Sequence, residues 1–393
     1  MTPDTTTTPG PQSLVAMMRQ HNDALDPRVV DAFLSIPRAA FLPGVPLDAV
    51  YQDEPVVLKR DTGGSVFSTS SQPSMMALMI DQMRLKEGHN VLEIGTGSGY
   101  NAAIMQRLVE PGGRVTTVEF DSQLAEQARD ALQRVQMNRV LVVEGDGAAG
   151  YAPRAAYDRI LATAGIWDVP RAWAKQLKPR GLIVAPIWFE GSQYSAAFRL
   201  QPDGTLYSER NLPCGFVHLR GVAAGPTLDL RVGNGSLAIS SAHLDEIDAV
   251  ALGMLLNADA QDGHLGHVLT SGDISYGAMP FLALALPGDD SFATFSVLGD
   301  QQPYGIDGHG FAVITKGSAC FVSAQGQGKA LVFGSADTLL AVQDGLSAWQ
   351  AAGRPTADRL RMRLSPISGS RPSEPKRGAV YTRADHYLEV WFA

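Results

Sequence analysis

The chain has 393 residues, which is long for one typical domain, and its hydrophobic fraction of 45% is enough for a sizeable core. The formal net charge is −8 and no strong basic block occurs, which argues against nucleic acid as a partner because phosphate contacts need clustered Lys and Arg. No apolar run is long enough to span a membrane, and the N-terminus lacks the basic-then-apolar pattern of a signal peptide.

The two cysteines, Cys214 and Cys320, lie in neither a CxxC nor a His-rich setting, so we predict no metal site. A disulfide between them is one alternative. The other is a reduced protein, which so low a cysteine content favours. We therefore expect a cytoplasmic location.

Residues 1–12 are polar and Pro-rich and are predicted to form a disordered tail. Two helices are expected between about Ser13 and Phe41, where Pro37 ends the second. An extended segment broken by Gly63-Gly64 follows. The run PSMMALMIDQMRL then predicts an amphipathic helix.

Strands and helices alternate through the middle of the chain, which predicts a mostly parallel sheet with helices on both faces. We therefore predict an α/β domain over residues 13–220. The expected strands are NVLEIG, RVTTVEF, RVLVVEGD, DRILAT and GLIVAPIW.

The sequence changes in character at about Gly221. Residues 221–235 are predicted to be a linker, and residues 243–256 and 336–353 to be helices. This order predicts a separate C-terminal α+β domain over residues 221–393, related to substrate binding. Its expected strands are SFATFSVL, GFAVIT, SACFVSA, KALVFG and HYLEVWF.

The run VLEIGTGSGY is predicted to end a strand and open a helix, with glycines that let the backbone turn tightly around a ligand. Its G-x-G-x-G spacing differs from the dinucleotide spacing. Glu119 and Asp146 lie at the ends of the next two strands. Glu119 can accept hydrogen bonds from ribose hydroxyls, and Asp146 can accept one from an adenine amino group. Together these features suggest S-adenosylmethionine, with an NAD-binding domain as the alternative. The predicted cofactor-binding residues are Glu93, Gly95, Thr96, Gly97, Ser98, Gly99, Glu119, Asp146 and Gly147.

Glu93, two residues before Gly95, has two interpretations. Its carboxylate could lie near the sulfonium or the amino group of the cofactor, whereas near a pyrophosphate it would repel. Alternatively, it holds the glycine loop without touching the cofactor.

Between about Val29 and Phe189 the chain resembles the protein-L-isoaspartate O-methyltransferase (PCMT) family. The resemblance implies a Rossmann-like, class I S-adenosylmethionine-dependent methyltransferase that releases S-adenosylhomocysteine. The matching segments are VVDAFLSIPRAAFLP, VLEIGTGSGYNAA, VVEGDG and LKPRGLIVAPI.

The run FSTSSQPSMMALM corresponds to a family loop that reads roughly T-I-S-A-P-H-M. In that register Ser71 matches the family's substrate-contacting serine, and Gln72 and Ser74 depart from the pattern. A bulkier amide in the acceptor pocket would suggest an altered substrate. We predict Ser71, Ser70 and Gln72 as catalytic residues, and Ser68, Thr69 and Trp167 as substrate-binding residues.

The same run allows a simpler interpretation. Ser70 or Ser71 could cap the helix that starts near Pro73, because Ser-x-Pro is a common helix entry. Both functions can coexist in four hydroxyl residues. The methionines that follow are predicted to pack in the core.

The C-terminal addition resembles extended family members that modify lanthipeptides, lasso peptides and graspetides. The resemblance implies methylation of an Asp in a ribosomally made peptide, linear or cyclised, leading to aspartimide or isoaspartate. The alternative is an enzyme that methylates isoaspartate in damaged proteins. A module that only binds peptides is the third hypothesis, and the intact glycine loop argues against it.

Overall fold

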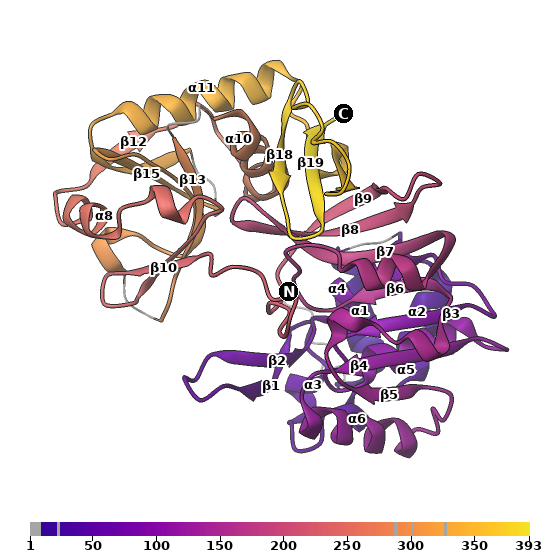
Figure 1. Ribbon diagram of the computed structural model, residues 1–393. Coiled ribbons are helices and arrows are strands. Elements are labelled where there is room, and N and C mark those ends of the chain that lie inside the picture. The colour runs from indigo at the N-terminus through magenta and orange to yellow at the C-terminus, as the bar shows by residue number, and fades with distance from the viewer. Residues whose placement is uncertain (1–8, 22–23, 287–289, 300–301, 326–327) are drawn as a thin grey trace. The chain divides into compact units, whose positions relative to one another are not determined.

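The computed structural model describes residues 9–21, 24–286, 290–299, 302–325 and 328–393 (Figure 1). Contacts divide the chain into two compact units. Unit 1 contains Met1–Pro186, Ser195–Glu209 and Phe216–Gly225, and unit 2 contains the remainder. This division does not test independent folding, so the domain boundary at residue 220 stays a prediction.

Unit 1 contains a sheet with the strand order β8-β7-β6-β3-β4-β5. The pairs β7–β6, β6–β3, β3–β4 and β4–β5 are all parallel, which confirms the predicted α/β class. The strands are β3 (Asn90–Ile94), β4 (Arg114–Glu119), β5 (Leu141–Glu144), β6 (Tyr157–Ala162), β7 (Leu177–Phe189) and β8 (Ser192–Leu200), and β9 (Leu206–Cys214) follows β8.

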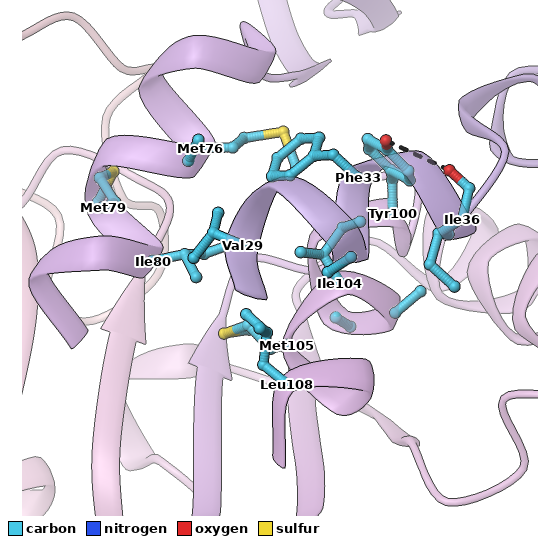
Figure 2. Packing of buried hydrophobic residues seen from close by; sticks show 14 of the residues in the cluster. Val29, Phe33, Ile36, Met76, Met79, Ile80, Tyr100, Ile104, Met105 and Leu108 are labelled. Atoms are coloured by element: carbon cyan, nitrogen blue, oxygen red, sulfur yellow. Dashed lines mark hydrogen bonds between the residues drawn. The ribbon is translucent and has the colours of Figure 1, made fainter. Parts of the chain in front are cut away.

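Helices α2, α4 and α5 of unit 1 contribute buried side chains to one apolar cluster. Figure 2 shows side chains of α2, α4 and α5 packed together, among them Val29, Phe33, Met76, Met79 and Ile104. Met76, Met79 and Met83 are buried in the core, as predicted, but Met76 and Met79 also line the cavity described below. The helices are α1 (Pro11–His21), α2 (Pro27–Ser35), α3 (Leu47–Val50), α4 (Pro73–Met83), α5 (Tyr100–Val109), α6 (Ser122–Arg134) and α7 (Arg171–Gln176).

A two-stranded antiparallel ribbon, β1 (Val56–Arg60) and β2 (Val66–Ser70), precedes α4. Val56 pairs with Ser70 and Val57 with Thr69. The hydroxyl residues up to Ser70 therefore lie in a strand. The expected loop is reduced to Ser71 and Gln72, because α4 begins directly at Pro73.

Unit 2 contains a seven-stranded sheet with the order β10-β11-β13-β14-β15-β16-β12, and every pair in it is antiparallel. Its strands are β10 (Asp229–Val232), β11 (Leu237–Ser240), β12 (Gln261–His264), β13 (Ser291–Val297), β14 (His309–Ile314), β15 (Ser318–Ser323) and β16 (Lys329–Gly334). A further group has the order β18-β19-β17 and comprises β17 (Leu360–Pro366), β18 (Gly378–Thr382) and β19 (His386–Phe392).

Both faces of the seven-stranded sheet are apolar. Phe311 and Val313 belong to one core cluster, whereas the alternate residues Ala312 and Ile314 belong to another. This alternation is what a strand covered on both sides requires. The helices of unit 2 are α8 (Ala249–Leu256), α9 (Ser271–Asp273), α10 (Met279–Ala285) and α11 (Asp337–Ala351).

Three expectations need correction. The second half of the predicted linker forms β10, which pairs with β11. The helix expected from residue 243 starts only at Ala249, where Asp248 accepts from the backbone N–H groups of Val250 and Ala251. Pro11 and Gln12, placed in the disordered tail, are the first residues of α1, and residues 1–8 lie outside the described part.

Cys214 and Cys320 are both free thiols. Of the helices that the structure describes, none combines the length and the hydropathy that a membrane span requires. Within the same described residues, no three His, Cys, Asp or Glu side chains gather closely enough to hold a metal ion.

Candidate active site

A cavity in unit 1 lies where strands β3, β4 and β6 end. Parallel strands bring their carboxyl ends to one edge of a sheet, and ligands of such sheets bind there. The cavity is lined by Phe67, Ser68, Thr69, Ser70, Ser71, Met76, Met79, Ile94, Gly95, Thr96, Gly97, Ser98, Tyr100, Asn101, Val118, Glu119, Phe120, Gly147, Leu161, Thr163, Ala164, Phe216, Val217, His218, Leu219 and Arg220.

The glycine loop forms one wall of this cavity. Gly95 has a φ of +94°, and a Cβ there would lie 2.5 Å from the Thr163 hydroxyl oxygen. That hydroxyl donates to the carbonyls of Ile94 (3.0 Å) and Gly95 (2.7 Å). The loop thus follows a path that only glycine permits, and the end of β6 holds it in place.

Glu119, at the end of β4, is buried and lines the cavity. Its Oε2 accepts from the backbone N–H of Gly97 (2.9 Å), and its Oε1 accepts from that of Asp121 (3.1 Å). Burial raises the pKa of this carboxyl, although the backbone donors oppose the shift. Each carboxylate oxygen can accept more than one hydrogen bond, so ribose hydroxyls can still bind here.

Glu93 does not line the cavity. It is fully buried, and its two oxygens accept from Asn101 Nδ2 (2.7 Å) and Thr117 Oγ1 (2.6 Å). Burial raises its pKa to about 7. This arrangement supports the interpretation in which Glu93 holds neighbouring segments and does not touch the cofactor.

Two other predicted cofactor residues are absent from the cavity wall. Gly99, with a φ of +84°, is the N-cap residue of α5. Asp146 accepts from the backbone N–H groups of Ala148 (2.9 Å) and Val222 (2.9 Å). Asp146 therefore ties two segments of unit 1 together, and its contact with adenine stays a prediction.

The hydroxyl residues from Ser68 to Ser71 all line the cavity. The Ser98 hydroxyl lies 3.5 Å from that of Ser70, and no hydrogen bond to the Ser71 hydroxyl occurs among the described residues. Capping of α4 by Ser70 or Ser71 is wrong, because the cap residue is Gln72 and its side chain makes no capping bond. The Ser71 hydroxyl thus remains available to a ligand.

Asp53 takes the place of Ser70 or Ser71 at the start of α4. Its Oδ1 accepts from the backbone N–H of Ser74 (2.8 Å), and its Oδ2 accepts from the side-chain amide of Gln72 (3.2 Å). Gln72 does not line the cavity. The prediction that its amide occupies the acceptor pocket is therefore wrong in this structure, because Asp53 binds that amide.

Arg38 is a buried cation behind the hydroxyl residues. Its guanidinium donates to the carbonyls of Ser70 and Ser71, at 3.5 and 3.1 Å. It also donates to the carbonyls of Val50, Gln52 and Glu54 at 2.9 to 3.1 Å. A guanidinium satisfies several carbonyls in a fixed geometry, so Arg38 positions the backbone on which the Ser71 hydroxyl stands.

Residues 216–222, here called the crossing segment, were not predicted to belong to the site. Gly165, after β6, bonds through its N–H and its carbonyl to Val217 and Leu219, both at 2.8 Å. At the other end Val222 binds Asp146, after β5. Since β3 and β4 lie between β6 and β5, the crossing segment passes over the edge that carries the glycine loop.

Trp167 is missing from the residues that line the cavity, so its predicted contact with the substrate has no support from the geometry. Its neighbourhood includes Gly225, just beyond the crossing segment. The sequence VHLR, Val217 to Arg220, alternates apolar and polar residues, which was the available signal for the crossing segment.

The cavity suits S-adenosylmethionine. Asn101 lines it and is 9% exposed, and its buried Oδ1 has no hydrogen-bond partner in the described structure. Its Nδ2 is bound to Glu93, which orients the amide. An acceptor in this position matches the amino group of the cofactor, and Glu119 matches its ribose. The G-x-G-x-G spacing of the loop differs from the dinucleotide G-x-G-x-x-G pattern, which disfavours a dinucleotide.

A family model described as Protein-L-isoaspartate(D-aspartate) O-methyltransferase (PCMT) matches residues 10–223, more than half of the chain. A Protein-L-isoaspartate O-methyltransferase of Methanopyrus kandleri is 42% identical over 195 residues, which cover 49% of this chain and 84% of that protein. One of Thermotoga maritima is 42% identical over 171 residues, which cover 43% of this chain and 53% of that protein.

A solved structure of a protein-L-isoaspartate O-methyltransferase is similar over 90% of this chain and 96% of its own, with 25% identity and a TM-score of 0.52. A tenth of this chain is far shorter than the stretch after residue 223. The similarity must therefore include most of that stretch, so the C-terminal region has a counterpart in that protein.

Proposed function

Because the chain belongs to the protein-L-isoaspartate O-methyltransferase (PCMT) family of S-adenosylmethionine-dependent carboxyl O-methyltransferases, we propose that it esterifies isoaspartyl carboxylates in peptides or proteins. S-adenosylmethionine is its cofactor. The observation that carries the proposal is the meeting of the Ser71 hydroxyl and the glycine loop in one cavity.

The chemistry asks for alignment and not for a strong base. When bound, the cofactor supplies a methyl group, which forms an O–CH3 bond to the acceptor while the electron pair of the C–S bond stays on sulfur. A carboxylate is ionised at neutral pH, so no proton has to be removed. The Ser71 hydroxyl donates to the acceptor carboxylate and orients it toward the methyl group, and Arg38 holds the Ser71 backbone that carries this hydroxyl.

Two features suggested the Asp of a ribosomally made peptide as the acceptor. Gln72 was the first, and its amide binds Asp53 outside the cavity. The C-terminal region was the second, and it has a counterpart in a protein named as an isoaspartate methyltransferase. We therefore favour isoaspartate, and an Asp acceptor in a linear or cyclised precursor peptide stays a prediction.

Labelled S-adenosylmethionine and three peptides test the acceptor. Two linear peptides differ only in Asp versus isoaspartate, and the third is the Asp peptide in cyclised form. We expect label in the isoaspartyl peptide alone. Methylation of the cyclised Asp peptide alone would contradict the proposal and support the tailoring of a natural product. Absence of methylation together with absence of cofactor binding would favour a peptide-binding module.

The function of Ser71 has its own test. Ser71→Ala should lower kcat/KM for the isoaspartyl peptide roughly 10- to 100-fold, the worth of one hydrogen bond to a charged group. S-adenosylhomocysteine affinity should stay within twofold. Ser65→Ala is the matched control, since Ser65 is an exposed residue of the turn between β1 and β2 and lies outside the cavity. If the folded Ser71→Ala variant kept full activity, the proposed function of this hydroxyl would be wrong.

A further inference from the structure

Arg220 is an exposed residue of the crossing segment, and it lines the cavity. Its guanidinium carbon lies 4.1 Å from the centroid of the Phe67 ring. No hydrogen bond or ion pair of this side chain occurs among the described residues. A flat guanidinium on an aromatic face keeps its N–H groups at the edge free to donate.

A second cation near the same ring shows what is special about Arg220. The Lys59 Nζ lies 5.7 Å from the Phe67 centroid, but it also lies 2.5 Å from Asp121 Oδ2. Lys59 is therefore neutralised by a partner. Within the described cavity wall, Arg220 is the side chain with a permanent positive charge, and it lacks such a partner.

We propose that Arg220, stacked on Phe67, is a subsite for a carboxylate of the peptide substrate outside the acceptor residue, so that the enzyme favours peptides with an acidic residue near the acceptor. This inference rests on the proposed function. Guanidinium and carboxylate match in geometry, and two parallel N–H···O bonds give the pair its preference over neutral groups.

The acceptor carboxylate itself is a poor occupant of this subsite. Phe67 and Ser71 are four residues apart around a strand end, roughly 13 Å at about 3.3 Å per residue. A guanidinium bound to the acceptor carboxylate would also make its oxygen a weaker nucleophile toward the methyl group. A peptide lying extended along β2 instead brings a residue about three to five positions from the acceptor to Arg220.

The carboxylate of the cofactor is the other source of the same chemistry. The predicted cofactor contacts Thr96 and Glu119 are buried, and Asn101 is 9% exposed, whereas Arg220 is exposed. A group at the exposed rim meets the peptide, which arrives from solvent. We therefore assign the subsite to the peptide.

A charge scan of the substrate tests the proposal. An isoaspartyl peptide of otherwise neutral residues is compared with versions that carry Glu or Gln at each position up to five residues on either side. We expect Glu at one or two positions to raise kcat/KM about fivefold over Gln, through a lower KM, as for a partly exposed ion pair. Raising the salt concentration should reduce that ratio.

Arg220→Gln should bring the ratio of kcat/KM between the Glu and Gln peptides to about one. Arg220→Lys should retain part of the preference for Glu. Arg139→Gln is the matched control, because Arg139 is exposed, lies outside the cavity and gives the same change in net charge. It should leave the ratio unchanged.

Three outcomes would overturn the assignment. The first is a wild-type ratio of one at every position. The second is an unchanged ratio in Arg220→Gln. The third is a large loss of S-adenosylhomocysteine affinity in Arg220→Gln, which calorimetry would detect and which would assign Arg220 to the cofactor. If the neutral isoaspartyl peptide is not methylated at all, the proposed function fails first, and the two failures are distinct.

Discussion

Unit 1 and unit 2 both bury charged groups, but the groups have different partners. In unit 1, Arg38 binds the backbone of Ser70 and Ser71, and Glu93 binds Asn101, so both charges contact residues that line the cavity. In unit 2, buried Glu190 lies 3.5 Å from His243 Nε2, and neither residue lines the cavity of unit 1.

The different partners predict which substitutions should affect catalysis. A buried charge is costly unless it is well paired. Each such charge must therefore either stabilise the fold or hold other residues in position. In unit 1 the charges fix segments whose exposed atoms meet the ligands. Changes there should therefore alter both stability and catalysis, whereas the ion pair of unit 2 should affect stability alone.

The largest expected effect is that of Arg38→Met. The variant leaves five carbonyls without their donor, which should lower the free energy of unfolding by about 3 to 5 kcal/mol in urea titrations. Methyl transfer by the protein that remains folded should also slow, since Ser71 loses its support. Arg139→Gln, an exposed control, should change stability by less than about 0.5 kcal/mol.

Glu93 makes a prediction about pH. Its pKa rises from 4.5 to about 7 on folding, so the folded state holds this proton more tightly than the unfolded state. The resulting stabilisation is complete below pH 4.5 and is lost as the pH rises to about 7. Relative to Glu93→Gln, the wild type should therefore lose up to about 3 kcal/mol over that range. Parallel pH profiles of the two proteins would contradict this prediction.

Gly95→Ala should reduce S-adenosylhomocysteine affinity about a hundredfold in calorimetry, through backbone strain and the clash with Thr163. Gly334 in unit 2 is even more crowded, since a Cβ there would lie 2.1 Å from the Gly317 carbonyl oxygen. Gly334→Ala should lower stability and leave the cofactor affinity of the folded protein intact. Equal losses of affinity would break the contrast between the units.

The smallest effect belongs to His243. Its hydrogen bond to Glu190 raises its pKa from 6.5 to about 9. This stabilisation is complete below pH 6.5 and is lost as the pH rises to about 9. Because the side chain is 45% exposed, His243→Gln should cost less than about 1 kcal/mol at pH 6. The difference in melting temperature should vanish above pH 9, and methyl transfer at pH 6 should be unaffected.

The sequence by itself determined the α/β class, the strand ends that carry Gly95, Gly97 and Glu119, and the family. It could do so because these features are local. Short apolar runs specify buried strands, and glycines with positive φ specify tight turns. Parallel strands then bring successive strand ends together without further information.

Tertiary structure decided the partners of these residues. Asp53 caps α4, Arg38 supports Ser71, and the crossing segment reaches from Gly165 to Asp146. Each of these contacts joins residues that are separated by 21 or more positions. The secondary-structure propensities of a short stretch of sequence predict the backbone conformation of that stretch. They do not predict which distant residue its side chains will contact. The register with the family loop likewise gives no information on Asp53, so it suggested an amide of Gln72 in the acceptor pocket, whereas Asp53 binds that amide outside the cavity.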